Sequence, residues 1–535
     1  MNKTMQADLS GIDPLVVNLS HRITVGDMPT RAAQTFGTRT ALIQGEQRVT
    51  YHQLEARSNA VARGLLAQGL ARGDALALQM GNRWEFLVTL FACAKIGVVV
   101  LPVNLALSAA DIAYQLTDSG VAAVATEQMW LPILQEALQQ ADGHAVRFVD
   151  LIGSGPAEVA GLPVHDWTGL LEHDEAVVET FVDERDVFQC LYTSGTTAAP
   201  KGVLTSHLAV QVAILSNALH FGVRPRGRGA VSSVVLPLFH TTALNCLVLP
   251  FLLVGGTVVL HAGFDADALV HDLQTHRTSH LTLLPVMWRG LLAHPRLREI
   301  DTSSVEVALY AMAPMPSSVL QSLRQTFPDA DVILGSGQTE TTPANELQWP
   351  EHQGVKDDSW GAPTVMSDVR IMGPDGSLLP RGEEGEIVYR SPQLMAGYWN
   401  NGPANTTAFA HGWFHGGDVG YIDDEGVVWF TDRTKDMVKT GGENVASVEV
   451  ERVVLSHPDV AECAVIGMPD ARWGEAVTAV VVLKAGAVPD QAVLLAHCKQ
   501  HLAGFKVPKR FRFVDSLPKT ATGKITKHKL RQRQA

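Results

Sequence analysis

The stretch ALALQMGNRWEFLVTLFACAKIGVVVLPVNLALSAADIAYQLTDSGVAAVAT (residues 75–126) decides the fold class. Three short apolar runs in it are typical of buried strands, namely ALALQM (75–80), VVVLPVN (98–104) and VAAVAT (121–126). Two segments between them have helical periodicity and end in glycine, namely EFLVTLFACAKIG (85–97) and SAADIAYQLTDSG (108–120), the second with a serine placed to cap it. Because apolar strands alternate with helices, we expect parallel sheets covered by helices on both faces.

The same alternation continues through residues 205–335, but the pattern changes beyond residue 360. Shorter strand patterns follow there, and the pairs Asp375–Gly376 and Glu425–Gly426 are typical of hairpin turns between them. This predicts a small β subdomain. The polar run DRTKDMVKTGGE (432–443) is unsuited to a core, so we place a domain boundary there.

Beyond that boundary, two helix patterns and two strand patterns fit a compact unit, namely VEVERVVLSH, CAVIGM, AVVVLK and DQAVLLAHCKQHLA. The expected fold is therefore α/β. It has a large N-terminal domain (residues 1–434) of βαβ parallel sheets with a small β subdomain, followed by a small, mobile α+β C-terminal domain (residues 435–535).

Composition limits the classes of function. The 535 residues include 55 acidic and 42 basic ones, a net charge of −13, which argues against a whole-protein affinity for nucleic acid or anionic membranes. The apolar stretch 246–260 is interrupted by Pro and Gly and is shorter than a membrane span of about 20 residues. The N-terminus lacks the apolar core of a signal peptide, the C-terminus RQRQA is no peroxisomal address, and five widely spaced cysteines fit reduced thiols. We expect a cytoplasmic protein with no integral membrane association.

The segment YTSGTTAAPKGV (192–203) carries the first functional signal. A loop of Gly, Ser and Thr can turn backbone N–H groups and hydroxyls toward a polyphosphate, and Lys201 can supply the opposite charge. It is not the Walker pattern, because Pro200 precedes the lysine and Gly202 follows it. The alternative is a solvated Ser/Thr turn between a strand and a helix.

With this segment, eight motifs occur in an order that resembles the adenylate-forming acyl- and aryl-CoA synthetases, relatives of luciferases and of peptide-synthetase adenylation domains. The resemblance runs from about residue 30 to 530. The motifs are YTSGTTAAPKG, LPLFHTTAL (236–244), GSGQTE (335–340), GEIVYRSPQLMAGYW (385–399), WFHGGDVG (413–420), DRTKD (432–436), KTGGENVASVEVE (439–451) and PKTATGKI (518–525).

The resemblance implies an enzyme that joins a carboxylic acid to AMP and then transfers the acyl group to a thiol. The first step brings two anions together, so it depends on charge neutralisation and positioning. ATP, Mg²⁺ and coenzyme A are the implied cosubstrates and metal. The implied phosphate cradle is Thr193, Ser194, Gly195, Thr196, Thr197 and Lys201, and the GSGQTE motif implies nucleotide contacts from Gly337, Gln338, Thr339 and Glu340.

In the same way, Glu340 and Thr196 are the implied Mg²⁺ positions, and Thr339 faces the α-phosphate. Asp418 is implied to accept the ribose hydroxyls with Arg433 beside it.

Lys524 in TATGKI is our choice for the main catalytic residue, placed to bridge the substrate carboxylate and the α-phosphate; the alternative is a solvated lysine of a basic tail. The resemblance makes Lys435 a hinge about which the small domain rotates between two poses.

In the second pose, Gly441 and Gly442 let backbone approach the pantetheine arm while Lys439 and Asn444 face the adenylate; the alternative is a plain glycine turn. His240 is implied to stand at the gate between the acyl pocket and the coenzyme A tunnel, although a lone histidine beside apolar residues is more often part of a core.

Several positions depart from the family pattern. Ser336 replaces an aromatic residue that stacks on adenine, AMAP (311–314) replaces GGAP, and His415 and Gly416 replace Arg and Thr in WFRTGD. HRTSH (276–280) has i,i+4 histidine spacing but no third zinc ligand. These departures leave nucleotide affinity and the choice of acid open.

We therefore expect an ATP-dependent acid–CoA ligase that forms an acyl-adenylate and then an acyl-CoA thioester, releasing AMP and pyrophosphate. The small apolar pocket segments favour a hydrophobic monocarboxylic acid, either a medium- or long-chain fatty acid or an aryl acid such as a cinnamate or benzoate. Two alternatives remain: loading of a carrier-protein phosphopantetheine, and a non-catalytic nucleotide-binding protein. The expected partners are small molecules and not nucleic acid, and a homodimer is left open.

Overall fold

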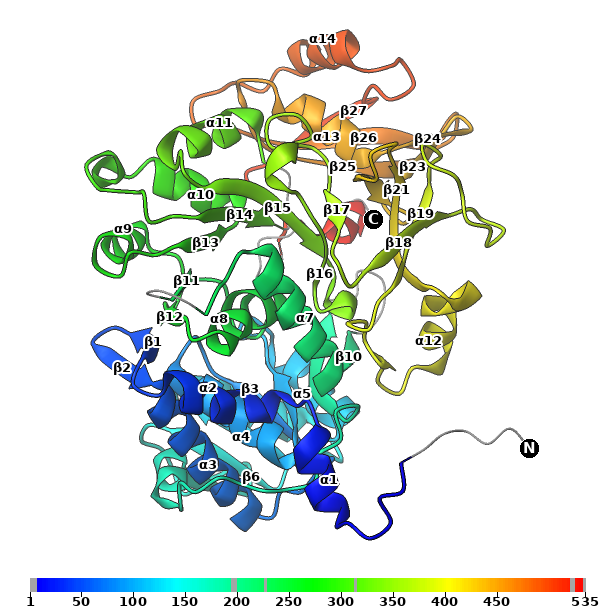
Figure 1. Cartoon of the computed structure of the whole chain (residues 1–535). Coiled ribbons are helices and arrows are strands. Elements are labelled where there is room, and N and C mark those ends of the chain that lie inside the picture. The colour runs from blue at the N-terminus through cyan, green and yellow to red at the C-terminus, as the bar shows by residue number, and fades with distance from the viewer. Residues whose placement is uncertain (1–6, 194–199, 226–228, 312–314, 520–524, 533–535) are drawn as a thin grey trace.

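The computed structural model describes residues 7–193, 200–225, 229–311, 315–519 and 525–532. Figure 1 shows a large body made of two helix-covered sheets and a β layer, with a small C-terminal unit at one end. In the described part of the chain, no helix combines the length and the apolar character needed to cross a membrane.

Sheet I, as described, has nine strands, and its central strands β12, β11, β13, β14 and β15 run parallel. In order across the sheet they are β17 (Ala362–Pro363), β16 (Ala344–Leu347), β15 (Asp331–Gly337), β14 (Val307–Ala311), β13 (His280–Leu283), β11 (Val231–Val234), β12 (Thr257–Leu260), β1 (Thr40–Gln44) and β2 (Gln47–Thr50). Antiparallel strands close both edges.

Sheet II also has nine described strands, of which β9, β4, β3, β5, β6 and β8 are parallel. Its order is β20 (Gly397–Tyr398), β10 (Lys201–Ser206), β9 (Val187–Thr193), β4 (Val99–Pro102), β3 (Ala75–Gln79), β5 (Ala123–Glu127), β6 (Phe148–Ile152), β8 (Leu162–Asp166) and β7 (Glu158–Val159).

Two smaller sheets follow along the chain. Sheet III is antiparallel and consists of β18 (Asp368–Met372), β19 (Gly385–Arg390), β21 (Phe414–Ile422) and β22 (Val428–Arg433). Sheet IV, in the C-terminal unit, consists of β24 (Glu443–Val445), β23 (Val438–Thr440), β26 (Gly474–Leu483), β25 (Val460–Asp470) and β27 (Arg510–Phe513).

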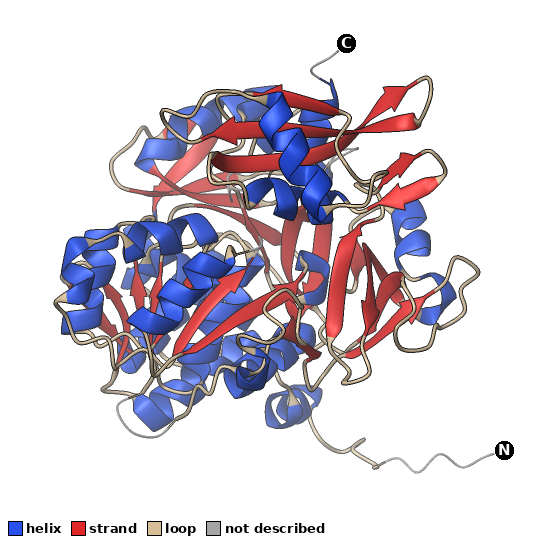
Figure 2. Ribbon diagram, turned by 90° about the horizontal axis from the view of Figure 1, so that it is seen from above, coloured by secondary structure: helices blue, strands red, loops and turns tan. Residues whose placement is uncertain are grey.

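Helices flank the sheets in the view from above (Figure 2). The described helices are α1 (Pro14–His21), α2 (Met28–Phe36), α3 (Tyr51–Ala67), α4 (Trp84–Ile96), α5 (Ala109–Ser119), α6 (Leu131–Gln140), α7 (His207–His220), α8 (Leu249–Leu253), α9 (Ala266–Thr275), α10 (Pro285–Leu292), α11 (Ser317–Thr326), α12 (Gly402–Ala408), α13 (Ser447–Leu455), α14 (Gln491–His501) and α15 (Lys527–Gln532). A π-helical segment, Thr242–Val248, precedes α8.

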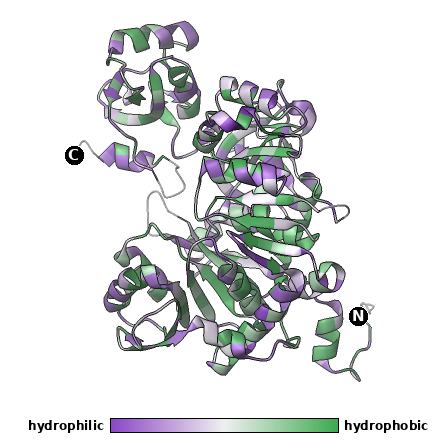
Figure 3. Ribbon diagram, turned by 90° about the vertical axis from the view of Figure 1, so that its left-hand side faces the viewer, coloured by the Kyte–Doolittle hydropathy of each residue, from purple (hydrophilic) through white to green (hydrophobic). Residues whose placement is uncertain are grey.

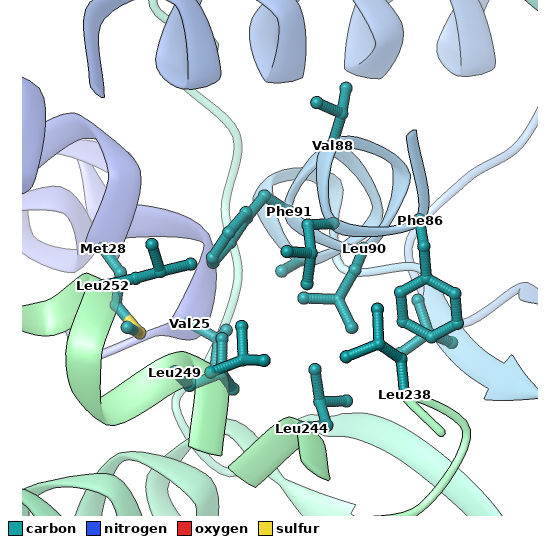
Figure 4. Packing of buried hydrophobic residues seen from close by; sticks show 14 of the residues in the cluster. Val25, Met28, Phe86, Val88, Leu90, Phe91, Leu238, Leu244, Leu249 and Leu252 are labelled. Carbon is teal, nitrogen blue, oxygen red and sulfur yellow. The ribbon is translucent and has the colours of Figure 1, made fainter. Parts of the chain in front are cut away.

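One apolar core joins sheets I and II. Side chains of α4 such as Phe86 and Leu90 pack against Leu244 and Leu249 from the second half of the large body (Figure 4). These four side chains are fully buried, and each such side chain contributes about 1.5–3 kcal/mol by leaving water. The two sheets therefore form one unit, and the ends of their strands are held in fixed positions relative to each other.

The strand–helix alternation predicted for residues 75–126 is confirmed. Helix α5 begins with a capping box, because the Ser108 hydroxyl accepts from the Asp111 N–H while the Asp111 carboxylate accepts from the Ser108 N–H. Helices α4 and α5 end at Gly97 and Gly120, both in the left-handed conformation that glycine adopts at little cost.

The predicted β subdomain is confirmed as sheet III, and Glu425–Gly426 forms the tight turn of the β21–β22 hairpin. The turn at Asp375–Gly376 is also present, but the residues after it make only a single bridge, Met372 to Leu378, and not a strand. The i,i+4 spacing in HRTSH is not helical: His276 is the C-cap that follows α9, and His280 belongs to β13.

The chain leaves sheet III at Arg433 and enters sheet IV at Val438. Figure 3 shows the C-terminal unit standing apart from the larger body, with apolar residues concentrated along its strands. Its own buried core includes Val450, Val465 and Val481. An ion pair of 3.2 Å joins Arg452 of this unit to Asp358 of the large body.

Candidate functional site

The YTSGTTAAPKGV segment connects two antiparallel strands. Strand β9 ends at Thr193, and β10 begins at Lys201 directly opposite it. The segment therefore lies between two strands and not, as the alternative had it, between a strand and a helix. The Tyr114 hydroxyl donates to the Pro200 carbonyl at 3.1 Å, which anchors the start of β10. The remaining cradle positions, Ser194, Gly195, Thr196 and Thr197, lie outside the described residues.

Tyr398 links Lys201 to Glu340. The Lys201 ammonium lies 4.5 Å from the centre of the Tyr398 ring, and the Tyr398 hydroxyl donates to Oε1 of Glu340 at 2.9 Å. Strand β20 places this tyrosine, because Tyr398 pairs with Val203 of β10. Burial, together with the Glu340 charge, raises the pKa of Tyr398 far above its usual value, so the hydroxyl stays protonated and remains a donor. The cation and the carboxylate predicted from distant motifs are thus neighbours.

The GSGQTE motif occupies the end of β15 and a 3₁₀ turn, Thr339–Thr341. Gly337 is required there, because an added Cβ would lie 1.5 Å from the Pro343 carbonyl oxygen. In parallel α/β sheets, ligands bind at the carboxyl ends of the strands. Strand β14 ends beside the motif, since Ala311 pairs with Gly335, so the AMAP and GSGQTE segments begin side by side.

Asp418 and Arg433 are brought together as predicted. They pair across β21 and β22, with 3.0 Å between Nε of Arg433 and Oδ1 of Asp418. Asp418 is almost fully buried. Its other oxygen, Oδ2, lies 2.5 Å from the Nε2 amide of Gln338. A buried carboxylate held by a guanidinium and an amide has a fixed orientation, which suits it to recognise hydroxyl groups.

A second acid lies behind this carboxylate and was missed in the sequence. Glu346 of β16 is fully buried, and it lies opposite Ser336 of β15. Burial raises its pKa well above the usual range, and the Asp418 charge raises it further. Among the described residues, neither of its oxygens has a well-aligned hydrogen bond. The sequence signal for it is weak, because Glu346 follows the polar Asn345 within the short strand ANEL (344–347).

Glu346 is accompanied by Tyr389 of β19, which is also buried. Burial and the charge of Glu346 raise the pKa of Tyr389 well above its usual value. Both shifts favour the neutral forms of these groups, while Asp418 beside them is paired with Arg433.

His240 lies before the π-helical segment, and burial lowers its pKa to about 4. Its Nε2 atom is buried and has no hydrogen-bond partner within the described part of the chain. The neighbouring HTTALNC segment reaches strand β16, where the Ala344 backbone contacts the Cys246 thiol. A neutral histidine beside small apolar residues can border an uncharged substrate group.

The KTGGEN motif forms a hairpin of sheet IV, in which Lys439 pairs with Asn444. Both side chains are exposed, and Gly441 and Gly442 form the turn with φ values of 62° and 89°. The Lys439 N–H donates to Glu475, and the Gly441 N–H donates to the Trp473 carbonyl. These contacts fix the hairpin within the C-terminal unit.

The predicted hinge residue Lys435 lies between sheets III and IV. Just before it, the Asp432 carboxylate accepts from both the N–H and the hydroxyl of Ser447, at 2.5 and 2.6 Å. Ser447 is the first residue of α13, whose own cap position, Ala446, offers no side-chain acceptor. Asp432 therefore caps a helix that lies on the other side of the predicted hinge.

The position chosen for catalysis, Lys524, lies outside the described residues. A surface hollow of about 450 Å³ lies elsewhere, between the Trp349–Lys356 region and the β21–β22 hairpin, and contains none of the predicted site residues. All five cysteines are buried with free thiols.

Comparison with known proteins gives the family. The AMP-binding enzyme family matches residues 29–399, and the AMP-binding enzyme C-terminal domain matches residues 449–524. The chain is 36% identical over 510 residues to a feruloyl-CoA synthase from an Amycolatopsis species, covering 95% of this chain and 99% of that protein. It is 34% identical over 493 residues to the long-chain-fatty-acid–CoA ligase FadD13 of Mycobacterium tuberculosis, covering 91% and 93%.

The fold agrees with a solved structure of ATP-bound MatB from Rhodopseudomonas palustris, with a TM-score of 0.85 at 30% identity, covering 95% of this chain and 98% of that one. The chain belongs to the AMP-binding enzyme family, in its acyl-CoA ligase branch. It is accordingly an AMP-forming acid–thiol ligase that uses ATP and coenzyme A.

Proposed function

We propose that this enzyme activates a hydrophobic monocarboxylic acid, either a fatty acid or an aryl acid, and transfers it to coenzyme A. The contact between Lys201, Tyr398 and Glu340 carries the proposal, because it places a cation and a carboxylate at the base of the Ser/Thr/Gly loop. The neutral surroundings of His240 and Cys246 favour an uncharged acyl group.

In the first half-reaction, the carboxylate oxygen attacks the α-phosphorus of ATP and pyrophosphate leaves. Lys201 neutralises phosphate charge, and Asp418 accepts the ribose hydroxyls with Arg433 beside it. Thr339 lies in the 3₁₀ turn just after β15 ends at Gly337, and from there its side chain can face the α-phosphate. Lys201 and Thr339 thus act on the phosphates, whose charge is redistributed in the transition state, while Asp418 and Arg433 position the nucleotide.

Mg²⁺ fits the same site. It usually takes one or two protein carboxylates together with substrate phosphates, and Glu340 offers a carboxylate beside the proposed phosphate position. When bound, the ion would neutralise the phosphate oxygens. Thr196, the second predicted ligand, lies outside the described residues. Tyr398 orients the Glu340 carboxylate through its hydroxyl.

For the second half-reaction, we propose that residues 435–535 form the mobile domain and that Lys435 is its hinge. In one pose the domain presents Lys524 to the substrate carboxylate, and in the other it presents the hairpin of Lys439 and Asn444. The thiolate sulfur then attacks the acyl carbon, and AMP leaves. Gly441 and Gly442 provide the close backbone approach.

The surroundings of that hairpin support coenzyme A as acceptor. Gly441 lies against Trp473, since a Cβ there would be 3.1 Å from the ring. The Arg472 and Lys509 cations lie 4.6 and 5.6 Å from the ring centroids of Trp473. An aromatic ring with cations around it suits a phosphorylated nucleotide.

The test is pyrophosphate release and ATP–pyrophosphate exchange over a panel of fatty, cinnamic and benzoic acids, with and without coenzyme A. Exchange with at least one hydrophobic acid, followed by thioester formation with free coenzyme A, is expected. Transfer to a holo carrier protein in preference to coenzyme A would overturn the acceptor, and exchange with dicarboxylic acids alone would overturn the acid class.

A further inference from the structure

The Gln338 amide fills the space beside Asp418 that a side chain at position 416 would need. A Cβ added at Gly416 would lie 2.1 Å from Nε2 of Gln338, and its three nearest neighbours would all be atoms of that amide. Gly416 lies in the interior of β21 and does not adopt the positive φ that requires glycine. The obstacle to a side chain at this position is thus the Gln338 amide and not the backbone.

The amide in turn holds the carboxylate. Its Nε2 atom lies 2.5 Å from Oδ2 of Asp418. The backbone of Gln338 is fixed as well, because its N–H donates to Oγ1 of Thr341 at 3.0 Å and to the Pro343 carbonyl at 3.1 Å. The amide therefore approaches Asp418 from a rigid turn.

We propose that Gln338 is a positioning residue for Asp418, and that Gly416 lacks a side chain so that the Gln338 amide can reach this carboxylate. The inference rests on the proposed role of Asp418 as acceptor of the ribose hydroxyls. Gln338 then acts on the nucleotide through Asp418. This replaces the direct nucleotide contact that the motif implies for Gln338.

The contacts of Asp418 explain why a second donor is needed. Arg433 holds only Oδ1, so Arg433 alone would leave the carboxylate able to turn about that ion pair. A hydrogen bond from Gln338 to Oδ2 fixes the plane of the Asp418 carboxylate. With that plane fixed, the two carboxylate oxygens keep a constant orientation, which is what recognition of two neighbouring hydroxyls requires.

A double-mutant cycle tests the proposal. Gln338→Ala removes the amide, and Gly416→Ala displaces it. Each should raise the KM for ATP about tenfold, the scale of a hydrogen bond to a charged group, with little change in kcat. The double variant should be no worse than either single one, because both changes remove the same contact. Gly169→Ala, with no atom within 4 Å of the new Cβ, is the matched control and should leave KM unchanged.

A second measurement uses 2′-deoxy-ATP and 3′-deoxy-ATP. The penalty for losing a ribose hydroxyl should be large in the wild-type enzyme and smaller in Gln338→Ala and in Gly416→Ala. Additive effects in the double variant, or an unchanged deoxy penalty in both single variants, would overturn the proposal. If the wild-type enzyme uses both deoxy analogues as well as ATP, and Asp418→Ala does not change their use relative to ATP, the proposed ribose role of Asp418 is rejected and not the role of Gln338. Melting temperatures within a few degrees of wild type show that each variant is folded.

Discussion

The Tyr398 hydroxyl donates a hydrogen bond of 2.9 Å to Oε1 of Glu340. Tyr398 belongs to a short edge strand of sheet II, whereas Glu340 follows the last parallel strand of sheet I. This contact therefore ties the two large sheets together at the site. The Tyr398 side chain also has two distinct contacts, since its ring faces Lys201 and its hydroxyl faces Glu340.

Tyr398→Phe should weaken the metal site while preserving the ring beside Lys201. Loss of an outer-shell partner typically costs ten-fold or more in metal affinity, so we expect the Mg²⁺ concentration for half-maximal exchange to rise about tenfold. Tyr398→Leu removes the ring as well and should also raise the KM for ATP. Titration of Mg²⁺ and of ATP in the exchange assay separates the two. Equal effects of both variants on both titrations would contradict the two roles.

Glu346→Gln should make stability less dependent on pH. Burial raises the pKa of Glu346 in the folded state above the ordinary value of 4.5, so the stability that comes from its neutral form is complete below pH 4.5. This contribution to the free energy of unfolding declines as pH rises toward the folded pKa, because the unfolded chain loses the proton first. The slope of the decline approaches about 1.4 kcal/mol per pH unit. Denaturant unfolding of both proteins between pH 5 and 9 measures this. Parallel profiles would show that Glu346 is ionised in the fold.

Ser447→Ala should loosen the connection between sheet III and the C-terminal unit. The change removes one of the two bonds to Asp432 and also the bond that Lys527 donates to the Ser447 hydroxyl, and a hydrogen bond to a charged group contributes about 1.5–3 kcal/mol. Hydrogen exchange across residues 434–446 should become faster. Ser456→Ala, a change at an exposed serine at the end of the same helix, is the control. Unchanged exchange in this segment would mean that the contact does not restrain the hinge.

Lys524→Ala should reduce acyl-adenylate formation by orders of magnitude, because it removes the ammonium proposed to bridge the carboxylate and the α-phosphate. Thioester formation from a supplied acyl-adenylate should be nearly intact, since that step uses the other pose. Single-turnover assays of the two half-reactions provide the measurement. Equal loss in both would reject this role for Lys524.

Gly442→Leu should impair the thiol step more than pyrophosphate exchange. Gly442 has a φ of 89°, which strains any other residue, yet a Cβ there meets no atom within 4 Å. The fold can thus accept the side chain sterically, and the effect reports on the approach of the pantetheine arm. Gly486→Leu, with a φ of 86° and similarly open space in the same unit, is the matched control. A greater loss of exchange than of thioester formation would dismiss the assignment.

Much of the secondary structure and the fold class could be predicted from the sequence, because they depend on interactions between residues close together in the chain. Helix caps such as Ser108, glycine stops such as Gly97 and apolar strands such as 75–80 depend on neighbours along the chain, so the fold class followed from periodicity. The motif order likewise gave Lys201, Glu340, Asp418 and Arg433. It could not show the contacts between motifs.

Only the tertiary structure decided those contacts. It placed the ring of Tyr398 between Lys201 and Glu340, and it buried Glu346 behind Asp418. The missing side chain at Gly416 can be explained only from the tertiary structure, which shows that Gln338, from the turn after β15 of sheet I, fills that space. Such relationships depend on which strands pack together, and this is set by burial of the whole core and by no single segment.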